Sequence, residues 1–319
     1  MKKNICIKFF RVVAIVILSI IVLFSLFIGG LNIFKHFYYK DYYSSLTKVG
    51  RIAGLEEGFV PQGLTYYDDG GYSAFISAGY MGDNSPSRIY AVRENTNEKS
   101  YFTLTSGGKP FFGHTGGIQY EDGFFYLANE GTGLYIFDSH FIKDSESGSS
   151  VEIGAPMELI NNTSFVFSQP DYLYVGEFNN NDKYACSNSI SYNGKTHKAI
   201  VTKYRIDELL VPVAVYSIPD EIQGFCITDD GTIVLSRSYS VSSSNFYVYK
   251  PENIIETGEL YKGATVYFLD EPDFNIKGPA MSEDLDLYKG KVITHFESAC
   301  NKYLFGKLFF ANYIAALEL

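Results

Sequence analysis

The sequence predicts an all-β domain that follows a single membrane-spanning helix, and three observations support this fold class. One uncharged apolar stretch lies near the N-terminus. After it, short alternating or β-branched runs such as 72–80, 172–178 and 291–298 recur, whereas helical periodicity is scarce. Aromatic residues make up 17% of the chain and glycine occurs 29 times, a composition typical of many short strands joined by tight turns.

The membrane-spanning helix is predicted at residues 12–34, a stretch of 23 residues without a charged side chain. At about 1.5 Å per residue, a helix of this length exceeds the ~30 Å hydrocarbon core of a bilayer. A cleaved signal peptide is the alternative, but such peptides have apolar cores of about 7–15 residues and a small-residue cleavage site, which this stretch matches weakly. We therefore expect an uncleaved, single-pass anchor in the cell membrane.

Basic residues flank this anchor unequally, with four before it and two after it. They are Lys2, Lys3, Lys8, Arg11, Lys35 and Lys40. Because the larger basic cluster tends to stay in the cytoplasm, we expect residues 1–11 to form a cytoplasmic basic tail and residues 35–44 a juxtamembrane linker. The domain at 45–319 is then expected to be extracellular.

The chain after the anchor is acidic. Six of the 26 Lys and Arg residues lie in the first forty positions, which leaves 20 against 36 Asp and Glu and a net charge near −16. Nucleic-acid binding requires clustered Lys and Arg to hold the phosphates. This charge balance therefore excludes nucleic acid as a partner.

Five copies of one strand–turn–strand pattern follow the anchor, each with a short strand, a turn and a more apolar strand. Equivalent positions in the five copies are Gln62, Gly116, Thr163, Gln223 and Glu283, at intervals of 54, 47, 60 and 60 residues. Repeats of this length, with about four strands each, are typical of propeller blades. The sequence thus predicts a five-bladed β-propeller. The alternative is a six-bladed ring with a further blade inside the irregular stretches 139–160 or 250–275.

Closure of the ring is predicted from two segments that lack partners. The last repeat has an inner hairpin and a third strand near 311–319, but the given sequence has no fourth strand after them. The segment 45–53 precedes the first repeat and has no other strand to pair with. We expect it to complete the last blade.

Polar residues gather at one end of the predicted ring. In each blade the two innermost strands are antiparallel, so the start of the first and the end of the second lie at the same end. The residues expected there are Gln62, His114, Thr163, Gln223, Glu283, Tyr80, Asn129, Glu130, Glu177, Asn179, Arg237, Ser238, Glu297 and Ser298. From this set we predict a ligand site at the mouth of an axial channel, formed by Gln62, His114, Asn129, Glu177, Gln223, Arg237, Glu283 and Glu297.

Three residues of this set are candidates for catalysis. Glu283 and Glu297 could act as a carboxylate pair in acid–base chemistry or hold a divalent cation, and His114 could serve as a base. Arg237 could clamp an anionic or sugar group. The alternative is purely structural, with Arg237 neutralising one of the two glutamates and the glutamines bonding backbone groups around the channel.

Cysteine usage leaves two possibilities open. Cys6 precedes the anchor, while Cys186, Cys226 and Cys300 follow it. The latter three allow one disulfide with one spare thiol, or three reduced and buried side chains. No Cys/His spacing predicts a zinc site.

Six short segments carry a family resemblance: VPQGL (60–64), GHTGGI (113–118), IQGF (222–225), LSRSYS (235–240), MSEDL (281–285) and FESACNKY (296–303). In these, residues 45–319 resemble bacterial extracytoplasmic β-propellers of the YncE-like, NHL-type and SMP-30/gluconolactonase-like kinds, and more narrowly secreted or anchored propellers of Gram-positive bacteria. Similarity to gluconolactonase-like propellers implies a divalent cation at the channel mouth, for which Glu283 and Asn129 would be the matching ligands. Similarity to YncE-like propellers implies a binding or scaffold role.

The function we expect is therefore a membrane-anchored binding module. It would engage a wall-associated or extracellular ligand, whether small molecule, glycan or protein, at the channel mouth. The alternative is a metal-assisted hydrolase, lactonase or lyase that acts on a sugar-like substrate with Glu283, Glu297 and His114.

Overall fold

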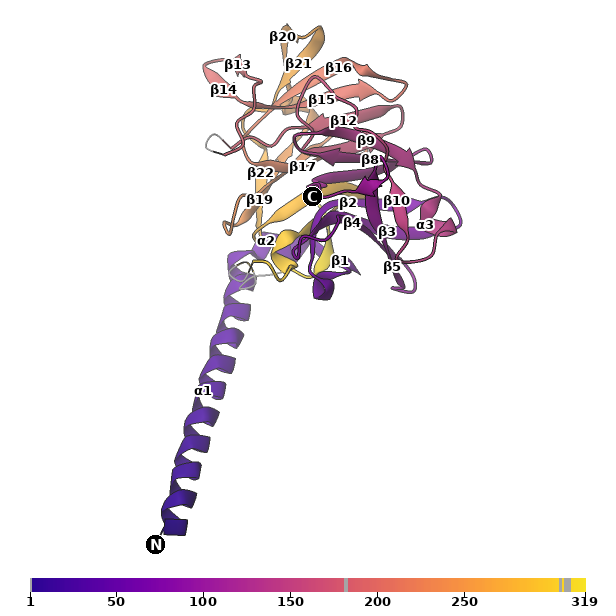
Figure 1. Ribbon diagram of the computed structural model, residues 1–319. Helices are drawn as coiled ribbons and strands as arrows, with labels where there is room; N and C mark the ends of the chain where they lie inside the picture. The colour runs from indigo at the N-terminus through magenta and orange to yellow at the C-terminus, as the bar shows by residue number, and fades with distance from the viewer. Residues whose placement is uncertain (1, 181–182, 304–305, 307–310) are drawn as a thin grey trace.

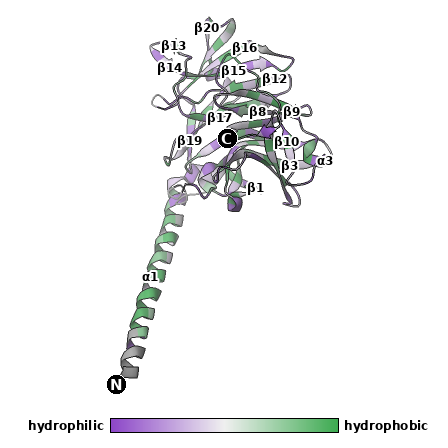
Figure 2. Cartoon of the chain, viewed as in Figure 1, coloured by the Kyte–Doolittle hydropathy of each residue, from purple (hydrophilic) through white to green (hydrophobic). Residues whose placement is uncertain are grey.

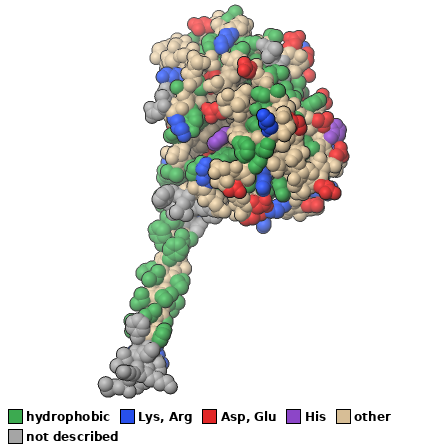
Figure 3. Space-filling model, viewed as in Figure 1, with side chains coloured by type: hydrophobic (Ala, Val, Ile, Leu, Met, Phe, Trp, Pro, Cys, Tyr) green, Lys and Arg blue, Asp and Glu red, His purple; other side chains and the backbone are tan. Residues whose placement is uncertain are grey.

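A long helix projects from a compact β domain in the computed structural model, which describes residues 2–180, 183–303, 306 and 311–319 (Figure 1). The helix is α1 (Lys2–Tyr38), and its segment Phe10–Tyr38 is long and apolar enough to cross a membrane. None of its most apolar part is buried against the domain, and Figure 2 shows hydrophobic residues along most of its length. Acidic side chains are spread over the visible face of the β domain instead (Figure 3).

The described residues of the β domain form five antiparallel blades, which we number in chain order. The strands of each blade are given from the axis outward. Blade 1 contains β2 (Phe59–Asp68), β3 (Ser73–Met81), β4 (Arg88–Arg93) and β5 (Lys99–Ser106). Blade 2 contains β7 (Gly117–Glu121), β8 (Phe124–Asn129) and β9 (Gly133–Asp138). Blade 3 contains β11 (Phe165–Gln169), β12 (Tyr172–Gly176), β15 (Ala199–Arg205) and β16 (Glu208–Ile218). Blade 4 contains β17 (Ile222–Ile227), β18 (Ile233–Arg237), β19 (Ser244–Tyr249) and β22 (Phe274–Gly278). Blade 5 contains β23 (Ser282–Tyr288), β24 (Lys291–Phe296), β25 (Tyr313–Leu317) and β1 (Leu46–Arg51).

The inner strands β2, β7, β11, β17 and β23 contact one another in a closed ring, so the prediction of a five-bladed propeller is confirmed. The two stretches considered for a sixth blade extend existing blades. Residues 139–160 contain α3 (Phe141–Asp144) and β10 (Ser150–Glu152), which pairs in parallel with β5. Residues 250–275 contain the hairpin of β20 (Ile255–Tyr261) and β21 (Ala264–Phe268), and β21 pairs in parallel with β16.

The remaining elements are short. They are α2 (Lys40–Ser45), β6 (Lys109–Pro110), the hairpin of β13 (Ile190–Tyr192) and β14 (Lys195–His197), and the 3₁₀ helices η1 (Leu55–Glu57), η2 (Pro251–Asn253) and η3 (Glu297–Ala299).

The predicted closure of the ring is also confirmed. Strand β1 pairs antiparallel with β25, with Leu46 opposite Leu317 and Arg51 opposite Tyr313. The strand that completes the last blade thus comes from the segment that directly follows the helices α1 and α2.

Helix α2 attaches the end of α1 to the propeller. The Tyr42 side chain is fully buried, and its ring centroid lies 6.4 Å from that of Phe246 in blade 4 and 6.0 Å from that of Phe296 in blade 5. The Tyr39 hydroxyl lies 3.1 Å from Ser243 Oγ. Residues 35–44 are therefore largely helical and packed against blades 4 and 5.

Glycines let neighbouring inner strands approach to backbone contact. A Cβ atom on Gly63 would lie 2.7 Å from the Ile118 nitrogen, and one on Gly224 would lie 2.8 Å from the Leu285 nitrogen. At the equivalent position of blade 5, the buried Asp284 accepts hydrogen bonds from the backbone N–H groups of Leu64 (3.2 Å) and Ile118 (3.1 Å). At this level of the ring the inner strands are in backbone contact, and the Asp284 side chain joins blades 1, 2 and 5.

Candidate ligand-binding rim

The rim is the end of the ring at which the inner strands begin and their neighbours end. On blades 1, 2 and 5 it brings together Tyr80 at the end of β3, His114 in the loop before β7, and Glu297 directly after β24. The rings of Tyr80 and His114 lie 4.4 Å apart, and the Tyr80 hydroxyl donates to Glu297 Oε1 at 3.1 Å. The structure therefore places two of the predicted site residues, His114 and Glu297, on either side of Tyr80.

The buried Glu283 and the half-buried Glu297 form a carboxyl pair at this rim. Burial, together with the neighbouring charge of Glu297, raises the pKa of Glu283 well above its usual range. Burial also raises the pKa of Glu297, to about 6, although hydrogen bonds from Tyr80 and Tyr303 and the charge of Lys302 oppose this shift. Because a buried carboxylate beside a second carboxylate cannot ionise cheaply, Glu283 holds its proton at neutral pH.

The Tyr80 hydroxyl connects this pair to the surface. It lies 3.1 Å from the Tyr303 hydroxyl and accepts a hydrogen bond from Lys302 Nζ at 2.9 Å. The Lys302 ammonium also lies 4.4 Å from the centroid of the Tyr80 ring. Burial and the charge of Glu297 raise the pKa of Tyr80, so the hydroxyl stays protonated and can donate a hydrogen bond.

His114 is neutral near pH 7. Partial desolvation and the positive charges of Lys302 and Lys183 lower the pKa of its imidazole below the usual value. Gln62, another predicted site residue, has a buried side chain, and the main-chain oxygen of Gln62 lies 2.9 Å from His295 Nε2. Neutral His114 can thus both donate and accept a hydrogen bond at the surface.

Two adjoining cavities open at this part of the rim and share Phe112 and His114. The larger, about 410 Å³, is lined by Phe111, Phe112, Gly113, His114, Asn129, Glu130, Thr132 and Tyr184. The smaller, about 230 Å³, is lined by Tyr80, Met81, Gly82, Asn84, Ser85, Ser87, Phe112, His114 and Lys302. We call the two together the rim cavity.

Asn129 supplies an unused acceptor at the edge of the rim cavity. Its side chain is 3% exposed, and its amide nitrogen donates to Thr132 Oγ1 at 2.5 Å. Its side-chain oxygen is buried and, among the described residues, has no hydrogen-bond partner. A buried acceptor without a partner is costly, and Gly113 lies directly against this oxygen.

Other predicted site residues are used within the protein, away from the rim cavity. Glu177 is buried in blade 3, where it accepts hydrogen bonds from the Asn162 N–H (3.0 Å), the Asn188 side chain (2.5 Å) and the Ile200 N–H (3.2 Å). This carboxylate ties a loop to the blade.

Arg237 forms an ion pair with Glu221 at 2.6 Å, and not with Glu283 or Glu297 as the structural alternative supposed. Gln223 is half-buried at an irregularity of β17 between Ile222 and Gly224. Neither residue lines the rim cavity.

No group of three or more His, Cys, Asp or Glu side chains within the described residues is arranged to hold a metal ion. Cys186, Cys226 and Cys300, all described, form no disulfide with one another. Burial raises the pKa of the Cys226 thiol, which lies in the core of blade 4.

Lys302, Tyr303, Phe112 and Tyr184 are the rim residues that sequence reasoning missed. They lie in loops outside the repeated hairpins, Phe112 between blades 1 and 2, Tyr184 within blade 3, and Lys302 and Tyr303 within blade 5, so they have no equivalent position in the fivefold repeat. The segment 296–303 was singled out by its motif, but nothing in the repeat predicted that its lysine would reach Tyr80 on another blade.

No protein-family model and no curated protein matches the sequence. Solved structures similar to the chain include a PQQ-bound aldose sugar dehydrogenase from Streptomyces coelicolor, 17% identical, with 79% of this chain and 77% of that chain covered and a TM-score of 0.44. A glutaminyl cyclase from Myxococcus xanthus is 10% identical, with 82% and 90% covered and a TM-score of 0.38. BamB from Moraxella catarrhalis is 5% identical, with 82% and 85% covered and a TM-score of 0.33. At these values the similarity carries no inference about activity or ligand.

Proposed function

We propose that this chain is a membrane-anchored β-propeller that binds an extracellular glycan in the rim cavity. The observation that carries the proposal is the exposed ring of Phe112, which borders both parts of the rim cavity beside the neutral imidazole of His114. Sugars present apolar ring faces together with many hydroxyl donors. Ligand pockets usually combine apolar walls with a few fixed polar groups in this way.

The aromatic wall supports a sugar-like ligand. Phe112 is 62% exposed at the border of the two cavities, so the face of its ring is open to a ligand in either one. Tyr184 and the neutral His114 lie along the same wall. Aromatic faces of this kind pack against the C–H groups of a sugar ring, while His114 would bond its hydroxyls.

Glycan binding is tested by titrating cell-wall sugars into the full-length chain in a detergent without a sugar headgroup, with calorimetry as the readout. Phe112→Ala is expected to weaken binding about tenfold, since an aromatic contact contributes on the order of 1 kcal/mol beyond its burial. Phe124→Ala is the matched control, because Phe124 is 45% exposed at the opposite end of blade 2. Equal affinity of Phe112→Ala and the unaltered chain, or no binding of any sugar, would refute the proposal.

The membrane part of the proposal rests on the length of α1 and on the uneven basic residues around residues 12–34. Protease added to intact spheroplasts should then digest the β domain and spare the N-terminal tail. A domain that is protected until the membrane is lysed would mean the opposite orientation, and a chain released from membranes by alkaline carbonate would mean that no anchor exists.

A further inference from the structure

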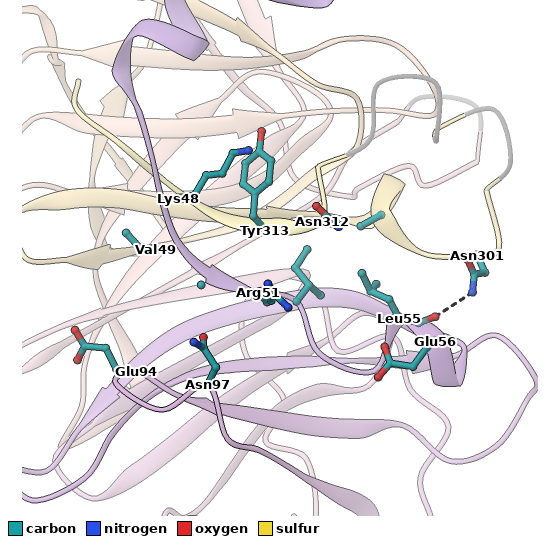
Figure 4. A pocket seen from close by; sticks show the side chains of 13 residues that line it. Lys48, Val49, Arg51, Leu55, Glu56, Glu94, Asn97, Asn301, Asn312 and Tyr313 are labelled. Atoms are coloured by element: carbon teal, nitrogen blue, oxygen red, sulfur yellow. Dashed lines mark hydrogen bonds between the residues drawn. The ribbon is translucent and has the colours of Figure 1, made fainter. Parts of the chain in front are cut away.

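A second large pocket lies where the ring closes, on the outer side of blades 5 and 1, away from the rim cavity. It has a volume of about 940 Å³. Strand β1 forms one wall, with Lys48 and Arg51, and the turn after β4 forms another, with Asn97. Figure 4 shows Arg51 near the middle, with Asn97 below it and Lys48, Tyr313 and Asn312 above it. We call this the closure pocket.

The acidic residues of the closure pocket are neutralised by cations that lie outside its lining. Glu94 accepts from Lys289 Nζ at 2.6 Å and from the hydroxyls of Tyr66 and Ser73. These hydrogen bonds, chiefly the one from Lys289, lower the pKa of Glu94 to about 2. Glu56 is paired with Lys99 at 2.6 Å.

The two cations of the pocket have no such partners. Within the described part of the chain, neither Lys48 nor Arg51 forms an ion pair, and both side chains are exposed. Lys48 instead lies 4.3 Å from the centroid of the Tyr313 ring, which holds its ammonium at the edge of the pocket without cancelling its charge. The closure pocket is thus locally cationic on a domain whose net charge is near −16.

The surrounding side chains suit an oxyanion. Asn97 and Asn312 are exposed carboxamides that can donate hydrogen bonds next to Arg51. A guanidinium offers paired, planar donors that match phosphate oxygens, and a lysine adds a point charge. A pocket that has amide donors and two cations without an ion pair among the described residues, and whose glutamates are already paired with lysines, is suited to a phosphoryl group.

The pocket also lies close to the end of α1. Strand β1 begins directly after α2, and the ammonium group of Lys48 is near enough to Lys35 to repel it. Lys35 is the first charged residue after the apolar stretch 12–34. At this position a phosphoryl group could come from a lipid headgroup or from a soluble compound.

We propose that the closure pocket binds a phosphoryl group through Arg51 and Lys48. The probes are inorganic phosphate and glycerol 1-phosphate, titrated into the full-length chain in phosphatidylcholine nanodiscs at low ionic strength. Arg51→Gln should weaken binding about tenfold or more, as expected for loss of a charge-assisted hydrogen bond, and Lys48→Gln should weaken it several-fold. Added salt should weaken binding to the unaltered chain as well.

Lys109→Gln is the matched control, because it removes the same charge from an exposed position outside the pocket. It should leave phosphate affinity unchanged. Thermal unfolding of the Arg51→Gln chain checks that it folds, and Lys48→Gln provides an independent variant at the same pocket.

A second arm identifies the source of the phosphoryl group. In nanodiscs that contain phosphatidylglycerol, suppression of glycerol 1-phosphate binding supports a lipid headgroup as occupant, whereas unchanged binding supports a soluble compound. The proposal is overturned if neither probe binds the unaltered chain, or if Arg51→Gln and Lys48→Gln bind phosphate as tightly as Lys109→Gln.

Discussion

At the scale of single residues, the carboxyl pair beneath Tyr80 makes the stability of the domain depend on pH. Glu283 is 3% exposed and lies next to Glu297, whose pKa is raised to about 6. A carboxyl with a raised pKa holds its proton more tightly in the folded than in the unfolded chain. Its contribution to stability is therefore complete below about pH 4.5 and is lost as the pH rises through about 6.

Glu297→Gln should remove the part of this dependence that Glu297 contributes. Between pH 4.5 and 7, the free energy of unfolding of the unaltered chain should fall by about 2 kcal/mol relative to Glu297→Gln, since one pKa unit corresponds to about 1.4 kcal/mol. Denaturant unfolding of the full chain at several pH values measures the difference. Glu98→Gln, at a side chain that is 72% exposed, should follow the unaltered chain. Parallel profiles for Glu297→Gln and the unaltered chain would contradict the buried pair.

The residues of the rim were only partly predictable. The alignment of the five copies placed His114, Asn129 and Glu297 at one end of the ring, because it fixes where the inner strands begin and where their neighbours end. It could not distinguish a glutamate that ties a loop, such as Glu177, from one near a cavity, because that depends on partners contributed by distant segments. Lys302 was missed for the same reason.

At the scale of elements, the glycines of the inner strands set the width of the ring. Gly63 and Gly224 each face the backbone of a neighbouring inner strand at a distance that leaves no space for a methyl group. Five blades enclose a narrow axis, so the strands nearest to it must approach at backbone contact. The repeat contains glycine at this position in three of its five copies, at Gly63, Gly117 and Gly224.

Gly63→Ala should therefore destabilise the propeller by about 1–3 kcal/mol, the usual cost of overpacking. Its Cβ would lie 2.7 Å from the Ile118 nitrogen, and backbone cannot move aside as a side chain can. Gly71→Ala is the control, because its Cβ would meet no atom closer than 3.7 Å. Thermal unfolding of both variants makes the comparison, and equal midpoints would show that the inner strands separate without cost.

The inner hairpins and the closing strand could be predicted because each has a local pattern that recurs five times. The parallel pairing of β10 with β5 and of β21 with β16 could not. A parallel partner that lies far away in the sequence leaves no turn signal between the two strands. The stretches 139–160 and 250–275 therefore looked irregular.

At the scale of the whole molecule, α2 fixes how the apolar helix meets the propeller. The contacts of Tyr42 with Phe246 and Phe296 span two blades, so the helix is attached at their junction. A flexible linker would leave the orientation of the domain open, whereas this packed joint defines it.

Tyr42→Ala should cost about 3–5 kcal/mol, the usual range for removing a buried aromatic side chain. It should also expose the segment 38–46 to limited proteolysis while the blades still resist. Phe37→Ala, at a side chain that is 78% exposed, is the matched control. If both variants melt alike and are cut alike, Tyr42 does not hold the joint.

The pairing of β1 with β25 has a mechanical consequence. The chain passes from α1 through α2 directly into β1, so any force between a surface-bound partner and the bilayer enters the domain at the strand that closes it. The hydrogen bonds between β1 and β25 and the packing of Tyr42 carry that load first. Tension strong enough to detach β1 would open the ring at blade 5 before it unravelled any other blade.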